Sequence, residues 1–188
     1  MMLPAELQSL LDQVDACEQS ASQLVDSLDD ATLNLTTPSG GWSAAQCLAH
    51  LTLMNDFYLR GWREAVDERR ARGRSTFNGL HPTPLGRWFA RSMEPPVKMK
   101  AKAVAAVTPP SMIPRAGLVQ AYKASHDVYR GLVGAAANVD VNRVVGPNAI
   151  VPWVKMRLAT VLLIIPAHDR RHLWQAERAA HRGAHRSS

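Results

Sequence analysis

Apolar residues recur every three or four positions along four long stretches of the chain, which is the period of a helix with one buried face. The stretches cover residues 3–29, 43–72, 115–138 and 153–181. The first is the most regular, with Leu3, Leu7, Leu10, Val14, Cys17, Ala21, Leu24 and Leu28 at spacings of four and three. The second opens with Ser43 and Gln46, spaced as a capping box, and the third follows Pro114, which suits a first helical turn. The pattern therefore predicts an all-α protein.

The lengths of the connections predict how these helices are arranged. Residues 30–42 join the first two helices and residues 139–152 join the last two, which is typical of antiparallel neighbours. Residues 73–113 separate the second helix from the third, and a connection of that length permits a crossover. We therefore expect an up-down-down-up four-helix bundle in a single domain, 1–188, with residues 182–188 as a frayed tail.

The crossover has predicted order of its own. TPLGRWFARSM, residues 83–93, favours a short helix that carries Trp88 and Phe89. VKMKAKAV, residues 97–104, alternates apolar residues with lysines, as an extended segment does. Because no partner strand is evident, we expect this segment to be an arm packed on the bundle, with Lys98, Lys100 and Lys102 in solvent.

Composition and charge exclude several classes of protein. No stretch approaches the roughly 18 apolar residues of a membrane span, and the N-terminus lacks the basic start and apolar run of a signal peptide. We therefore expect a cytoplasmic protein with no membrane partner, in which Cys17 and Cys47 are small core residues. The net charge of +6 is spread over helix surfaces without a nucleic-acid-binding motif, so we expect no specific nucleic acid partner.

His168 and His172 lie one helical turn apart, so both imidazoles would project from the same face of the fourth helix. The apolar residues Val161, Leu162, Ile164 and Ile165 lead into this face. Pro166 predicts a bend just before the pair. The spacing alone is a weak motif, because His181 and His185 share it in the predicted tail. The position on an apolar stripe is what distinguishes His168 and His172.

His50 continues an apolar face of the second helix, formed by Cys47, Leu51, Met54 and Phe57. It lies about 10 Å from the start of that helix, and the histidine pair lies roughly 15 to 20 Å from the end of the fourth. In antiparallel helices these levels nearly coincide. Three neutral imidazoles are suitable ligands for zinc, nickel or a similar divalent ion, and the alternative is three separate core histidines satisfied by hydrogen bonds.

Two segments resemble the signatures of a known family. GGWSAAQCLAHL, residues 40–51, is similar to the second-helix signature of the DinB-like (DinB/YfiT-like) metal-binding bundles, and AHDRRHLWQAER, residues 167–178, resembles their fourth-helix signature. The resemblance spans nearly the whole chain. It implies an up-down-down-up bundle, a metal site at His50, His168 and His172, and homodimers formed through helix faces. The crossover stretch WFARSMEPPVKMKAKA departs from many family members, so substrate specificity does not transfer.

The resemblance also implies the kinds of reaction to expect, because members of the wider superfamily catalyse thiol-dependent transfers with bacillithiol or mycothiol, a mycothiol-dependent isomerisation, and hydrolysis. Three protein ligands leave one coordination position open, where a water can be acidified or a thiol held as its thiolate. We expect a metal-dependent transferase or hydrolase whose small-molecule substrate is a low-molecular-weight thiol or an electrophile. The alternative is a noncatalytic, metal-stabilised binding or stress-response module.

Five further residues are candidates for supporting roles. His126, on the third helix, is either a fourth ligand, an acid/base group or a helix-surface histidine. Gln175, one turn past His172, would orient a ligand or a bound water. Arg170 and Arg171 either attract an anionic substrate or lie in solvent. Trp42 is predicted to pack as a staple before the Ser43 cap rather than to contact substrate.

Overall fold

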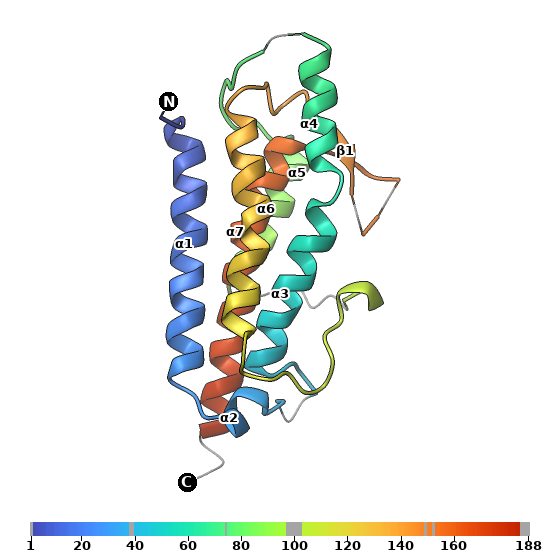
Figure 1. The fold of residues 1–188 in the computed structure, drawn as a ribbon. Helices are drawn as coiled ribbons and strands as arrows, with labels where there is room; N and C mark the ends of the chain where they lie inside the picture. Colours follow the sequence, from blue (N-terminus) through green and yellow to red (C-terminus); the bar gives the residue numbers. More distant parts are fainter. Residues whose placement is uncertain are drawn as a thin grey trace.

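The computed structural model describes residues 2–37, 40–73, 75–96, 103–148, 150–151 and 153–184. Most of these residues are helical, and the strands among them form one short antiparallel pair (Figure 1). The helices are α1 (Ala5–Asp26), α2 (Asp30–Asn34), α3 (Ala44–Leu59), α4 (Trp62–Ala71), α5 (Pro84–Ser92), α6 (Leu118–Ala136) and α7 (Leu158–Ala184), with a 3-10 turn, η1, at Ala105–Val107. The strands are β1 (Val145–Pro147) and β2 (Lys155–Arg157). The prediction that the protein is mainly helical is therefore confirmed, and the short strand pair is the part that the prediction of an all-α protein missed.

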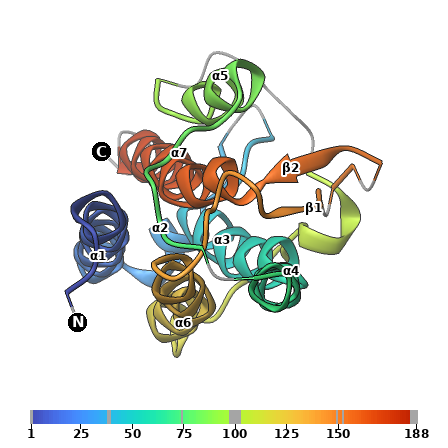
Figure 2. The same ribbon diagram turned by 90° about the horizontal axis from the view of Figure 1, so that it is seen from above.

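The long helices α1, α3, α6 and α7 pack side by side, as Figure 2 shows from above. Both α1 and α3 contact α6 and α7. The apolar stripe predicted for the first helix is buried from Leu7 to Ala21. Burying one leucine or valine side chain completely contributes about 1.5 to 3 kcal/mol, so these inward faces provide much of the driving force for packing.

The buried apolar side chains form two clusters, and polar side chains lie between them. On α7, Ile165 belongs to one cluster and Leu173 to the other. On α6, the same two clusters contain Tyr129 and Tyr122. The buried polar residues on α6 and α7 between these levels are Ser125, His126, Asp169 and His172, and α3 contributes the buried polar residues His50 and Asn55. The bundle interior therefore contains a polar layer, in which every group needs a partner.

The second predicted helix, residues 43–72, is interrupted, and the prediction of one continuous helix was wrong. α3 ends at Leu59 and α4 begins at Trp62. Gly61 separates them with a φ of 83°, in the left-handed region that side chains with a Cβ rarely adopt. The turn buries Trp62, which is 2% exposed. A local helical period cannot reveal such a change of direction.

The start of the fourth helix was also predicted too early. α7 begins at Leu158, because Lys155–Arg157 pairs with Val145–Pro147 as strand β2, with Val145 opposite Arg157. Trp153, the predicted start, is 83% exposed. The amide of Leu158 donates to the Val144 carbonyl at 3.0 Å, so the hairpin leads directly into the helix.

Two other boundaries differ by a few residues. α1 ends at Asp26 rather than near Asp29, because Asp29 instead caps α2 by accepting a 2.7 Å hydrogen bond from the Thr32 amide. α6 begins at Leu118, after Gly117 and not directly after Pro114. Arg115 donates to the carbonyl of Val25 at 2.7 Å and also to that of Leu28. This arginine therefore ties the segment before α6 to the last turn of α1 and to the turn that follows it.

The crossover contains the predicted short helix, α5, whose start is capped by the Thr83 hydroxyl accepting from the Gly86 amide at 3.0 Å. In Figure 2, α5 lies on the side of α7 away from α6. The predicted extended arm falls mostly outside the described residues, as do Lys98, Lys100 and Lys102. The predicted tail is helical as far as Ala184, and His185 lies outside the described residues.

Among the residues that the structure describes, no helix combines the length and the apolar character needed to cross a membrane.

Candidate metal centre

His50 from α3 and the pair His168 and His172 from α7 come together inside the bundle. One possible ligand atom from each of the three lies within 4.8 Å of the other two. The ring centroids are 4.5 Å apart for His168 and His172, 4.6 Å for His50 and His172, and 5.4 Å for His50 and His168. The helical period placed each of these side chains on an inward face, and the packing of α3 on α7 brings the faces together.

The surroundings of the cluster favour neutral imidazoles. Burial lowers the pKa of His50, although a hydrogen bond to Val107 acts in the opposite direction. Burial, followed by the charges of His50 and Arg171, lowers the pKa of His168 to about 3. Burial and the other two histidines also hold the pKa of His172 well below its usual value. Neutral imidazoles retain the lone pair that a metal ion requires.

The orientation of His50 is set by the crossover. Its Nδ1 lies 2.7 Å from the Val107 carbonyl oxygen in η1. A carbonyl can only accept, so Nδ1 carries the proton and Nε2 keeps its lone pair. Such a contact to the second ring nitrogen is the usual way in which proteins orient a metal-binding histidine. Nothing in the sequence around Val107 signalled this role, because the contact spans 57 positions of the chain.

Trp42 lies against the cluster rather than only at the start of α3. Its ring centroid is 4.6 Å from that of His50 and 5.9 Å from that of His172. The predicted capping box of Ser43 and Gln46 is present, with hydrogen bonds of 3.1 and 3.2 Å. The cap holds the start of α3 in place and so positions the tryptophan beside the histidines.

Gln175 lies beside His172, as its position one turn further along α7 predicted. The side chain of Gln175 acts on the imidazole as a hydrogen-bond acceptor does and raises the pKa of His172, against the larger lowering effect of burial. The Nδ1 atom of His172 is buried and has no hydrogen-bond partner. An orphaned buried imidazole nitrogen requires an explanation, and metal ligation would supply one.

His126 lies outside the cluster, and the prediction that it is a helix-surface histidine was wrong, since it is completely buried. Its Nδ1 is 2.8 Å from Glu18 of α1, and its Nε2 is 2.9 Å from Asp169 of α7. Both ring nitrogens are thus occupied by carboxylates. This arrangement leaves His126 no nitrogen with which to serve as the predicted fourth ligand.

The two arginines beside the ligands differ in their surroundings. Arg170 donates to Glu94 at 2.9 and 2.5 Å and to Gln13 at 2.8 Å, so it joins α7 to α1 and to the segment after α5. Arg171 is 8% exposed and donates to the Ser92 carbonyl at 3.3 Å. Its charge also lowers the pKa values of His168 and His172. A positive charge is therefore held next to the histidine cluster.

The fold and the three-histidine cluster place the chain in the class of helical proteins with a candidate internal metal site. The DinB superfamily model matches residues 13–176, and the chain belongs to this superfamily. Comparisons with curated proteins and with solved structures found no significant match.

Proposed function

We propose that His50, His168 and His172 hold one divalent metal ion, zinc or nickel, and that the protein is a metal-dependent transferase or hydrolase acting on a small thiol or electrophile. The observation that carries the proposal is the convergence of three neutral imidazoles within 4.8 Å. Separate core histidines, each satisfied by hydrogen bonds, would not need to converge. The unpartnered Nδ1 of His172 also argues against that alternative. Three imidazoles form the ligand set of some catalytic zinc sites.

A divalent ion bound by three protein ligands supplies Lewis acidity at an open coordination position. The role of the chain is to orient the ligands and to favour the substrate. The Val107 carbonyl aims His50, and the Trp42 ring covers two of the imidazoles. Arg171 adds a positive charge that favours an anionic substrate group, such as a thiolate, over a neutral one.

The metal content of the purified protein tests the site. We expect about one divalent ion per chain by inductively coupled plasma mass spectrometry, and its loss in His168→Ala. His81→Ala is the matched control, because His81 is exposed and hydrogen-bonds to the Asn78 carbonyl at 3.0 Å. Wild-type protein without stoichiometric metal after supplementation with zinc or nickel would contradict the proposal.

The reaction is tested separately with metal-loaded protein. Low-molecular-weight thiols with electrophilic acceptors, and activated esters for hydrolysis, are the substrates to screen. Turnover that disappears in folded His50→Ala protein supports the enzyme. Stoichiometric metal without turnover, combined with a large fall in thermal stability on chelation, favours the noncatalytic metal-stabilised module.

We further infer that residues 1–188 form one domain with the up-down-down-up order and a crossover at 73–113. The inference is supported by the paths of the helices in Figure 1, where α1 and α7 run downward and α3 and α6 run upward. Homodimerisation through helix faces stays a prediction, and sedimentation velocity measures it.

A further inference from the structure

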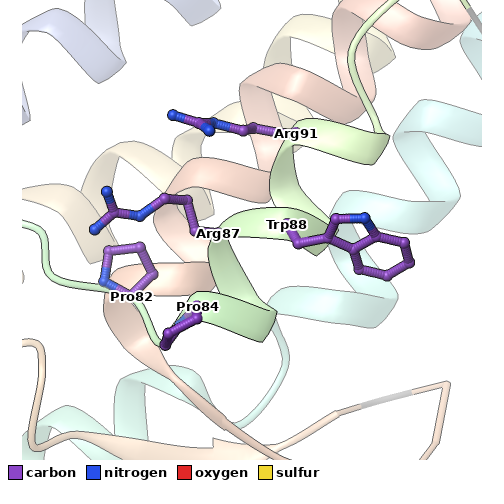
Figure 3. Close-up of a pocket in the computed structure, with 5 residues that line it drawn as sticks. All are labelled: Pro82, Pro84, Arg87, Trp88 and Arg91. Atoms are coloured by element: carbon purple, nitrogen blue, oxygen red, sulfur yellow. The ribbon is translucent and has the colours of Figure 1, made fainter.

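Helix α5 carries two arginines, Arg87 and Arg91, whose charges are not neutralised by an ion pair with any acidic side chain that the structure describes. They lie one helical turn apart, and Figure 3 shows both side chains extending to the same side of α5. The nearby carboxylate of Glu94 is instead held by Arg170 through two hydrogen bonds. Like charges one turn apart repel each other, and an anion held between the two guanidinium groups would relieve this repulsion.

Both arginines line two pockets on the surface of the bundle. One pocket, of about 510 Å³, is also lined by Pro82, Pro84 and Trp88. The other, of about 350 Å³, lies between α5, α1 and α7, and its walls include Leu80, Pro82, Ala90, Leu163 and Ala167. Both volumes fall within the usual range for small-molecule sites. The arginines therefore offer positive charge at the edge of one largely apolar pocket and of a second pocket whose lining mixes apolar with charged residues.

The backbone of α5, which carries both arginines, is held in place by close packing on α7. Gly86 permits this approach, because a Cβ at that position would lie only 2.5 Å from the Thr160 Oγ1. The Thr83 cap begins the helix, and Arg171 donates to the Ser92 carbonyl at its end. A fixed helix backbone keeps the spacing of the two arginines and so reduces the conformational entropy lost when a ligand binds.

We propose that this face of α5 binds a small organic anion. The phosphate or carboxylate group of the ligand would lie between Arg87 and Arg91, and its apolar part would contact the apolar residues that line the adjoining pockets. Guanidinium groups match the geometry of both anions and can bind them through paired hydrogen bonds. Glu6, Glu94 and Arg170 also line the second pocket, and Arg170 holds Glu94 through two hydrogen bonds. Because the carboxylates repel an anion, the anionic group of the ligand would lie at Arg87 and Arg91. The proposal is independent of the histidine cluster, whose residues line neither pocket.

The test is calorimetric titration of the full chain with 1-naphthyl phosphate and with its neutral analogue 1-naphthol. We expect saturable binding of the phosphate at one site per chain, and binding about tenfold or more weaker for naphthol. Arg87→Gln/Arg91→Gln should weaken phosphate binding by about tenfold or more. The matched control is Arg63→Gln/Arg72→Gln, on α4 and directly after it, which removes the same charge from side chains that are 65% and 75% exposed and should leave the affinity unchanged.

Several outcomes would overturn the proposal. Equal affinities for the phosphate and for naphthol would remove the need for an anion, and this comparison uses only wild-type protein. Equal losses in the two double variants would indicate nonspecific charge attraction. Binding that persists in Arg87→Gln/Arg91→Gln but disappears in His50→Ala would place the anion at the histidine cluster. Wild-type protein that shows no saturable binding would also refute it.

Discussion

The hydroxyl of Tyr129 on α6 donates a 2.6 Å hydrogen bond to the carbonyl oxygen of Leu162 on α7. Pro166 lies four residues after Leu162 and has no amide hydrogen, so this carbonyl lacks its usual helical donor. Tyr129 supplies the missing donor from the neighbouring helix, within a fully buried environment. A proline can therefore lie in α7, two residues before the first candidate ligand, without leaving a buried carbonyl unsatisfied.

Replacing Tyr129 with phenylalanine should lower the free energy of unfolding by about 1 to 3 kcal/mol, because the Leu162 carbonyl would then be buried without a partner. Urea denaturation measures the change. Tyr58→Phe is the control, since Tyr58 donates to the weak acceptor Met156 Sδ, and it should cost less than about 1 kcal/mol. Equal effects of the two variants would show that the backbone carbonyl is not the important acceptor.

The buried group formed by Glu18, His126 and Asp169 should contribute strongly to stability. Burial lowers the pKa of His126, but Asp169 and then Glu18 outweigh this effect, and the pKa is raised above 6.5. His126→Phe would leave Asp169 buried without its cation and should cost about 3 to 5 kcal/mol. His81→Phe, at an exposed position, should change stability by less than about 0.5 kcal/mol.

The raised pKa of His126 also sets the sign of its pH dependence. Its contribution is fully present below the unfolded pKa of about 6.5 and is lost as the pH rises through the raised folded value. The difference in unfolding free energy between wild type and His126→Phe should therefore shrink toward alkaline pH. A constant difference across that range would contradict a charged His126.

The candidate ligand His168 predicts the opposite slope for the metal-free protein. Its pKa is about 3 when folded and has an ordinary value of 6.5 when unfolded, so between these values only the unfolded chain is protonated. Lowering the pH from 7 to 5 in the presence of chelator should cost wild type about 2 kcal/mol more than His168→Asn. Denaturation curves at the two pH values measure this, and parallel losses in both proteins would exclude the lowered pKa.

Replacing either of two helical glycines with alanine should change the stability of the protein in opposite directions. Gly134 in α6 has open space where a Cβ would be added, so Gly134→Ala should stabilise the protein by about 0.5 to 1 kcal/mol. Gly86→Ala should destabilise it by about 1 to 3 kcal/mol, because the new Cβ would overlap Thr160. Thermal unfolding compares the two variants, and a stabilising Gly86→Ala would show that α5 packs less closely on α7.

The helices could be predicted because helical periodicity is a local property of the chain. The inward position of His50 and the pairing of His168 with His172 follow from spacing within single helices. The interruption at Gly61 could not be predicted in this way, since glycine is tolerated in helices and its left-handed conformation, which accompanies the burial of Trp62, is set by the tertiary structure. The hairpin before α7 was missed because its strands are three residues long and have no extended alternation.

The sequence by itself determined that three histidines lie on apolar helical faces and that the family is DinB-like, because both depend on short local patterns. Only the tertiary structure decided the partners of each imidazole. Val107 orients His50 from across the crossover, and two carboxylates enclose His126, which spacing alone could not separate from the ligands. The physical reason is that a hydrogen bond depends on where distant segments meet, whereas helical periodicity describes only one helix at a time.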